Sequence, residues 1–245
     1  MSPAESALLV GAAFLAGVVN SLAGGGSLLT VSLLVVFGLP GGVANGTNRV
    51  GILAQNAAAA WRFGAEGVAG LGHSLPLLAP VLAGSVLGAL GIAQVADETF
   101  ERLFGVVMLA LLVPILRGSA PAAAARRTWS PWTRSALFFA IGLYGGSFQA
   151  GVGIPLLFAL SYAGYDLVTA NHIKVVLIFA VTAVAVPVFL WQGQIAWLPA
   201  AALAAGFLAG GELGARLAVR GGERLIRPVL LVAVVALAGR MLRLY

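Results

Sequence analysis

The 245-residue sequence contains no cysteine and only two histidines. The lack of cysteine excludes disulfide bonds, thiolate metal sites and a cysteine nucleophile. Charged residues are also scarce, at 9% of the chain, whereas soluble domains contain about 25%. A soluble chain of this length could not cover its surface with so few charges, so soluble enzymes, nucleic-acid-binding modules and disordered proteins are excluded. We expect no cofactor and no metal site.

Apolar residues are what the chain has in excess. They make up 60% of it, and the mean hydropathy is +1.02. This composition is typical of a polytopic membrane protein, whose helices need about 20 apolar residues to cross the hydrocarbon layer. Six segments are predicted to cross: Val43–Trp61, Leu71–Ala96, Phe104–Leu116 with its flanks, Val168–Trp191, Ile195–Val219 and Leu225–Leu242.

Two further apolar stretches are interrupted by polar, glycine-rich patches. Ser6–Phe37 is interrupted by Asn20–Ser27, and Ser135–Ala163 is interrupted by Gly145–Pro155. The halves on either side of each patch are only about 10–14 residues long, which is short for a membrane span. We therefore predict half-helices that meet near the midplane of the bilayer.

The sequence repeats itself. Ala23–Gly26 matches Ala150–Gly153 at an offset of 127 residues, and Gly38 matches Gly164 at an offset of 126. The pair Gly84/Gly88 likewise matches Gly210/Gly214 at an offset of 126. One gapped alignment covers nearly the whole chain, which predicts two structural repeats.

The repeats divide the chain into residues 1–117, a basic linker at 118–134, and residues 135–245. Each repeat is predicted to hold a broken or re-entrant helix pair followed by three transmembrane helices. A repeat crosses the membrane five times if the pair spans it and three times if the pair is re-entrant. Both numbers are odd, so the second repeat is inverted. The predicted fold is an all-α polytopic membrane protein with two inverted repeats.

Loop charges predict the orientation. One side carries nine positive and three negative residues: Arg62, Glu66, Arg117, Arg126, Arg127, Arg134, Asp166, Arg216, Arg220, Glu223, Arg224 and Arg227. The other side carries three positive and four negative residues: Glu5, Asp97, Glu98, Glu101, Arg102, Arg240 and Arg243. Because basic loops stay in the cytoplasm, we expect a cytoplasmic linker, both termini outside, and a multi-pass location in the inner (plasma) membrane. The basic excess then reflects topology, and no nucleic-acid partner is expected.

Four ionisable side chains remain at membrane depth: Arg49, His172, Lys174 and Glu212. Each cation there costs roughly 2.5–3.5 kcal/mol on insertion scales, so such groups are kept for pairing or function. Arg49 and Lys174 occupy nearly equivalent places in the repeats. They either form part of a site or extend to a nearby interface. Glu212 is either a proton carrier or a partner for Arg216, one turn on.

The glycine patches indicate an anion site. A helix that restarts after a break offers unpaired backbone N–H groups and the positive end of its dipole, and glycine lets an anion approach closely. The alternative is that these glycines serve only helix packing. Fifteen substrate-binding residues are predicted: Asn20, Gly24, Gly25, Gly26, Ser27, Asn45, Thr47, Asn48, Arg49, Gln149, Gly151, Gly153, Asn171, His172 and Lys174.

Three alternatives remain at this stage. An electropositive midplane would also suit an anion channel. The tripeptide Gly-Gly-Ser occurs twice, ending at Ser27 and Ser147, so an intramembrane serine protease with His172 as its base is a further, weaker interpretation. The Gly84/Gly88 and Gly210/Gly214 faces would suit either a homodimer or packing within one chain.

The two glycine motifs and their surroundings resemble a known family. Asn20–Thr30 (NSLAGGGSLLT), Gly38–Pro40 and Ala44–Arg49 (ANGTNR) are similar to the first repeat of the TauE/SafE sulfite exporters. Tyr144–Gly153 and Ala170–Lys174 are similar to the second repeat. The resemblance covers essentially the whole chain. It implies a membrane transporter, usually an exporter, of sulfite, organosulfonates or related small anions.

Overall fold

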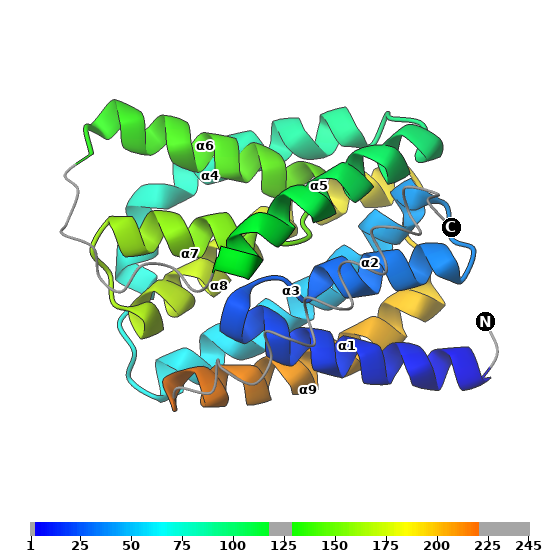
Figure 1. Cartoon of the computed structure of the whole chain (residues 1–245), viewed down its shortest axis with the longest axis horizontal. Coiled ribbons are helices and arrows are strands. Elements are labelled where there is room, and N and C mark those ends of the chain that lie inside the picture. The colour runs from blue at the N-terminus through cyan, green and yellow to red at the C-terminus, as the bar shows by residue number, and fades with distance from the viewer. Residues whose placement is uncertain (1–2, 118–128, 221–245) are drawn as a thin grey trace.

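A computed structural model describes residues 3–117 and 129–220. Regular structure in these ranges is entirely helical, and the helices lie roughly along one long axis (Figure 1). The described helices are α1 (Pro3–Ala23), α2 (Ser27–Val36), α3 (Gly41–Ala65), α4 (Leu71–Ile92), α5 (Asp97–Arg117), α6 (Pro131–Ser147), α7 (Gly153–Tyr162), α8 (Leu167–Trp191) and α9 (Trp197–Val219). The predicted span Leu225–Leu242 lies outside the described residues.

The breaks are shorter than the polar patches that predicted them. α1 has 21 residues and α6 has 17, so the expectation of 10–14 residues is wrong for both, whereas α2 and α7 have 10 each. α1 continues through the polar residues because their side chains bond inside the protein: Asn20 donates to Gln55, and Ser21 donates to the carbonyl of Gly211. At the other end, Ser130 caps α6 and starts it at Pro131.

The chain reverses direction at each break. Gly26 packs against the backbone of Ala16, so the start of α2 lies beside α1. In the second pair, the Tyr144 hydroxyl donates to the carbonyl of Ala150, and Gly145 faces Val152. α1 and α2 form a hairpin that enters from the right-hand end in Figure 1, whereas the α6–α7 hairpin enters from the left-hand end. Each pair is therefore a helical hairpin, and the two hairpins enter from opposite ends of the molecule.

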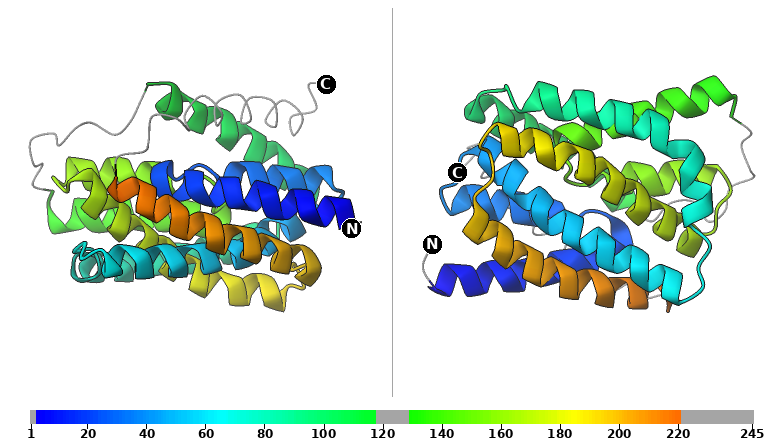
Figure 2. Two further views of the ribbon diagram at one scale, coloured as in Figure 1. Left: turned by 90° about the horizontal axis from the view of Figure 1, so that it is seen from below. Right: turned by 180° about the vertical axis from the view of Figure 1, so that it is seen from behind.

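The two longest helices, α3 and α8, form the centre. α9 and α1 pack on the α3 side, and α4 and α6 pack on the α8 side (Figure 2), while α5 crosses obliquely at the outside. Gly84 and Gly88 press against the backbone of α6, and Gly210 and Gly214 press against α1. These small-residue faces are therefore occupied within the chain.

Left-handed glycines mark the repeat. In the described part of the chain, the glycines with positive φ form three pairs at the ends of corresponding helices. The pairs are Gly24 with Gly151, Gly38 with Gly164, and Gly67 with Gly193. Their separations are 127, 126 and 126 residues, the offsets of the sequence alignment. The same turns therefore recur in both parts of the chain.

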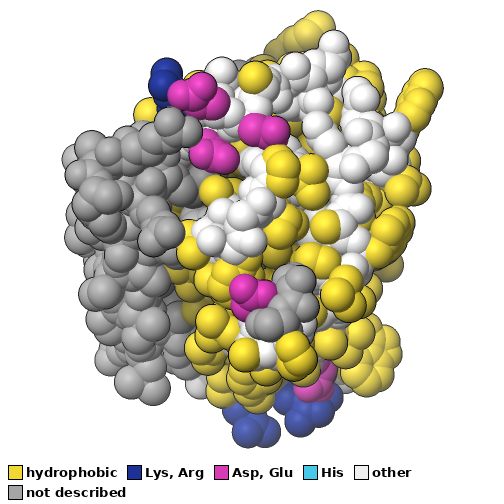
Figure 3. All heavy atoms as spheres, turned by 90° about the vertical axis from the view of Figure 1, so that its right-hand side faces the viewer, with side chains coloured by type: hydrophobic (Ala, Val, Ile, Leu, Met, Phe, Trp, Pro, Cys, Tyr) yellow, Lys and Arg dark blue, Asp and Glu magenta, His cyan; other side chains and the backbone are white. Residues whose placement is uncertain are grey.

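Four of the described helices are long and apolar enough to cross a membrane: α1, α4, α8 and α9. Exposed tryptophans lie at or near helix ends, as expected of side chains at a membrane interface: Trp61, Trp132, Trp191 and Trp197. α3 is less apolar, but its polar residues Asn45, Thr47, Asn48 and Gln55 are buried inside the protein. Acidic side chains gather at the end where α5 begins (Figure 3).

Candidate substrate site at the helix breaks

The two breaks touch each other through glycine backbones. A Cβ atom placed on Gly24 would lie 2.5 Å from the Cα of Gly153, and a Cβ on Gly153 would lie 2.5 Å from the Cα of Gly24. Gly24 also has a φ of +83°, which side-chain-bearing residues rarely adopt. The regions where α2 and α7 begin therefore meet, and both lie in the segments predicted to form the site.

Lys174 binds the C-terminal end of α1. Its side chain is fully buried. The ammonium nitrogen donates to the carbonyls of Asn20 at 2.9 Å and Ser21 at 3.2 Å, and to the Oδ1 atom of Asn171 at 2.7 Å. These carbonyls belong to the last turn of α1, and that of Asn20 also accepts from the backbone amide of Gly24 at 3.0 Å. The cation thus closes the end of α1 at the break.

Arg49 does the same for α6, from the other repeat. It too is fully buried, and its guanidinium carbon lies 4.4 Å from the ring centre of Phe189. Nη2 donates to the carbonyls of Gly146 at 2.6 Å and Ser147 at 3.0 Å. Nη1 donates to the carbonyl of Gly145 at 3.2 Å and to Oε1 of Gln149 at 3.0 Å.

We call each cation with its helix-end carbonyls a clasp, and the two clasps are reciprocal between the repeats. Arg49 on α3 closes α6, and Lys174 on α8 closes α1. The carbonyl of Ser147 accepts from Arg49, and the carbonyl of Asn20 accepts from Lys174. These two acceptors are 127 residues apart, which is the offset of the glycine motifs. Because both cations are buried and bound inside the protein, the interpretation that they extend to the membrane surface is wrong.

Some polar atoms beside the clasps have no hydrogen-bond partner. They include the donors Arg49 Nε and Asn48 Nδ2 and the acceptor Asn45 Oδ1, all buried on α3. The other ends of both asparagines are held: Asn48 Oδ1 accepts from Thr30 at 2.7 Å, and Asn45 Nδ2 donates to the carbonyl of Ser147 at 2.8 Å. Buried unpartnered donors are costly in a folded protein and call for an explanation.

The helix restarts are only weakly capped. The amide of Ser27 donates to Asn20 Oδ1 at 3.4 Å, and the amide of Gly151 donates to the Ser27 hydroxyl at 3.4 Å. Both distances exceed those of good N–H···O bonds. Gly25 and Gly26 are buried beside them. The next amides, of Leu28, Leu29 and Ile154, donate to the turn carbonyls of Gly25, Gly26 and Gly151. The starts of α2 and α7 therefore contribute mainly the positive ends of their helix dipoles.

Two predicted site residues lie away from the breaks. The Thr47 hydroxyl accepts from the amide of Ala196 at 2.9 Å, in the loop before α9. His172 Nδ1 lies 2.7 Å from the carbonyl of Val68, in the loop before α4. The hydroxyl of Ser147 donates to backbone carbonyls, so the hydrogen bond of His172 goes to neither serine of the protease interpretation.

Glu212 lies at the linker end of the molecule. Its carboxylate accepts from Arg216 at 2.6 Å and lies 4.0 Å from Arg62. Glu212 is therefore an ion-pair partner of Arg216, as the second alternative predicted, and does not lie beside the breaks.

Several polar partners were not predicted because they lie outside the segments 20–27, 45–49, 149–153 and 171–174, from which the predicted site residues come. Gln55 holds Asn20, Thr30 holds Asn48, and Thr182 accepts from the amide of Gln149. Each is a polar residue within an apolar stretch, and that signal was present in the sequence.

Comparison with known proteins agrees with this architecture. The family model described as "Sulfite exporter TauE/SafE" matches residues 9–241. A probable membrane transporter protein, ORF9, from Sinorhizobium sp is 29% identical over 96% of this chain and 92% of its own length. A probable membrane transporter protein of Haemophilus influenzae is 27% identical over 96% of this chain and 93% of its own. YfcA of Escherichia coli K12, also named a probable membrane transporter protein, is 26% identical over 99% and 91%.

No solved structure matches the chain significantly. The family match covers nearly all of the sequence, and these relatives are covered almost end to end. The chain belongs to the TauE/SafE family of membrane transporters.

Proposed function

We propose that this transporter moves a small anion such as sulfite or an organosulfonate across the inner membrane, outward, by alternating access at the helix breaks. The observation that carries the proposal is the contact between Gly24 and Gly153 with two fully buried cations beside it. A buried cation at membrane depth needs a reason to be there. Closing a helix end is one reason, and attracting an anion is the other.

The charges around each break favour an anion even after the helix ends are counted. The C-terminal end of a helix carries roughly −0.5 charge and the N-terminal end roughly +0.5. At the first break, Lys174 outweighs the end of α1, and the start of α2 adds to the excess. Each break is left with roughly +1 charge, and the two breaks are in contact.

The available donors suit an oxyanion. Arg49 Nε and Asn48 Nδ2 are buried and unpartnered. The starts of α2 and α7 add the positive ends of their helix dipoles. These two N–H donors and the positive charge suit a group with several acceptor oxygens, as in sulfite or a sulfonate. The glycines leave the backbone open to close approach.

Inverted repeats would explain the movement. The two hairpins enter from opposite ends, and each is clasped by the central helix of the other repeat. Rocking of one repeat against the other around a fixed site is how inverted-repeat transporters expose a site to each side in turn. The small anion is then the transported partner, and the lipid bilayer is the surrounding medium.

Anion binding is tested with two anions and a neutral compound that matches one of them in shape. Purified protein is unfolded by heat in the presence of sulfite, of methanesulfonate, or of dimethyl sulfone, which resembles methanesulfonate but carries no charge. A ligand of the folded state at 100 times its dissociation constant stabilises by about 2.7 kcal/mol. The anions should raise the unfolding temperature and the sulfone should not. Equal effects of all three would contradict an anion site.

A matched pair of variants places the ligand. Asn48→Ala removes an unpartnered donor, whereas Asn56→Ala changes a buried asparagine about two turns further along α3, whose amide bonds the Ile52 carbonyl. A hydrogen bond to a charged group contributes about 1.5–3 kcal/mol. Anion affinity should therefore fall roughly 10- to 150-fold in Asn48→Ala and remain near wild type in Asn56→Ala. Equal affinities would remove Asn48 from the site.

An anion channel is the competing function, because the same positive charge would suit a continuous pore. Flux through the reconstituted protein distinguishes the two. Saturation at low turnover together with counter-transport supports a carrier, and single-channel steps proportional to voltage would end that interpretation.

A further inference from the structure

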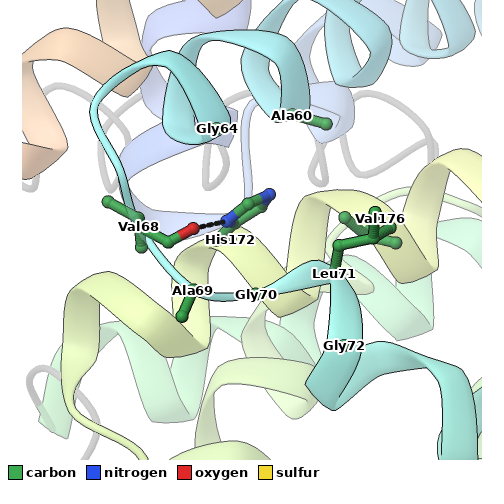
Figure 4. Close-up of a pocket in the computed structure, with 9 residues that line it drawn as sticks. All are labelled: Ala60, Gly64, Val68, Ala69, Gly70, Leu71, Gly72, His172 and Val176. Carbon is green, nitrogen blue, oxygen red and sulfur yellow. Dashed lines mark hydrogen bonds between the residues drawn. The ribbon is translucent and has the colours of Figure 1, made fainter.

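A cavity lies at the linker end of the molecule, away from the helix breaks. Its volume is about 370 Å³, within the range of ligand pockets. The end of α3, the loop residues 68–72 and the start of α8 line it (Figure 4). Among the lining residues only His172 has a polar side chain. The cavity is thus an apolar chamber with a single group that can change its charge.

The structure fixes which nitrogen of His172 can take up a proton. Nδ1 lies 2.7 Å from the carbonyl oxygen of Val68. A carbonyl only accepts, so Nδ1 carries the hydrogen and the lone pair of the neutral ring is on Nε2. Phe63 stacks on the ring at 5.5 Å and holds its plane. Figure 4 shows the second nitrogen pointing away from Val68.

The equivalent helix-to-loop contact in the other repeat is made by a glycine instead of a histidine. The position 126 residues before His172 is Gly46, and the position 126 residues after Val68 is Gln194. A Cβ atom on Gly46 would lie 2.1 Å from the Gln194 carbonyl oxygen. At the equivalent contact in the first repeat, Gly46 of α3 therefore packs directly against the loop before α9. The fold does not require a histidine here, so His172 serves a purpose specific to this end.

His172 is also close to the clasp along α8. Its neighbour Asn171 accepts from Lys174, which closes α1 at the break. The other charged or titratable groups on the surrounding elements do not line the cavity: Arg49, Arg62 and Glu66 on α3, His73 on α4, Tyr165 and Asp166 before α8, Lys174 on α8, and Glu212 and Arg216 on α9.

We propose that His172 is a proton-binding site that couples anion transport to proton movement in the same direction. This rests on the proposed anion transport and adds its coupling ion. A proton binds Nε2 from the linker side and gives an imidazolium, which retains its bond to Val68. Nε2–H then donates to an anion oxygen in the chamber. The pair is neutral, and the proton leaves with the anion.

The experiment uses full-length protein in sealed vesicles, with radiolabelled methanesulfonate as the anion. Methanesulfonate does not change its charge between pH 5.5 and 7.5, so any pH dependence belongs to the protein. A pH-sensitive dye inside the vesicles reports protons. In wild type, methanesulfonate entry should acidify the lumen, and uptake should fall at least about fivefold from pH 5.5 to 7.5, the range in which histidine titrates.

His172→Gln and His172→Asn remove the titrating group and keep a side chain that can bond Val68. Their uptake should change less than about twofold across the same pH range, without acidification. His73→Gln is the matched control: this second histidine is exposed on α4 and packs edge-on against Tyr165. It should behave as wild type does.

The outcomes separate the two proposals. No methanesulfonate entry in wild type at any pH would overturn the anion function itself. Entry without acidification, which needs no variant to observe, would overturn proton coupling alone. A pH dependence in both His172 variants equal to that of wild type would remove His172 from the coupling.

Discussion

The ammonium nitrogen of Lys174 lies 2.9 Å from the carbonyl oxygen of Asn20 at the end of α1. The residues are 154 positions apart and belong to different repeats. Together with the Arg49 contacts to α6, this bond ties each hairpin to the central helix of the other repeat. The cations therefore stabilise the packing of the two repeats and also make the centre of the protein positive.

Replacing Lys174 by methionine should destabilise the protein. The change keeps most of the side-chain volume but removes three hydrogen bonds, and the carbonyl of Asn20 then keeps only the amide of Gly24 as its donor. Bonds to charged groups contribute about 1.5–3 kcal/mol each and do not add fully. We expect a loss of about 3 kcal/mol, measured as thermal unfolding in detergent.

Arg102→Met is the control for charge removal. The Arg102 side chain is 70% exposed and pairs with Glu98 one turn away on α5. Exposed pairs of this kind contribute about 0.3–0.5 kcal/mol. If Lys174→Met were as stable as Arg102→Met, Lys174 would not be a clasp.

The contact between the breaks should tolerate no side chain. In Gly24→Ala the new methyl group meets the Gly153 backbone at 2.5 Å, and φ is +83°. Gly38→Ala places alanine at φ +89° with open space around it, so it isolates the backbone cost of about 1–2 kcal/mol. We expect Gly24→Ala to lose clearly more stability than Gly38→Ala, and to lose transport. Similar losses in both variants would show that the breaks can separate without cost.

Much of the architecture could be predicted from the sequence because hydropathy and glycine act locally. The breaks at Gly24 and Gly151 fall in the predicted patches, and the positive-φ glycines keep the offset of the alignment. The length of α1 was underestimated because polar residues at its end looked like a break. They are helical since Gln55 and Gly211, distant in sequence, satisfy them.

The roles of the two buried cations could not be predicted. Their partners are mainly backbone carbonyls, which every residue has, so no sequence pattern marks them. His172 is a similar case: it was grouped with Lys174 because the two are close on one helix. Its ring instead lies against the α3–α4 loop, which only the packing of α3 on α8 brings there.

Asp166 should make stability depend on pH at the start of α8. Its carboxylate accepts from the amides of Thr169 and Val168 at 3.0 and 3.1 Å, and hydrogen bonds, chiefly those with Thr169, hold the pKa of Asp166 below its usual value. A depressed pKa gives stability that is present above the unfolded-state value of about 3.9 and is lost as the pH falls through the folded-state value.

Asp166→Asn keeps a cap that does not titrate. Wild type should therefore lose unfolding temperature relative to Asp166→Asn as the pH is lowered from 6 to 3. Asp166→Ala, which has no cap, should lose about 1 kcal/mol at neutral pH. Parallel curves for wild type and Asp166→Asn at every pH would show that the carboxylate cap contributes nothing that titrates.

The orientation prediction concerns the two ends of the molecule. Described helices and turns place Arg62, Arg134, Arg216 and Arg220 at the linker end, and Glu5, Asp97, Glu98 and Glu101 at the opposite end (Figures 1 and 3). Positive loops face the cytoplasm.

The chain has no native cysteine, so single cysteines can be introduced without background. Ser130→Cys and Gln94→Cys change exposed residues at the linker end and the opposite end. In intact cells a membrane-impermeant maleimide should label Gln94→Cys and leave Ser130→Cys unlabelled until the membrane is opened. Labelling of Ser130→Cys from outside would place the linker outside and overturn the predicted orientation.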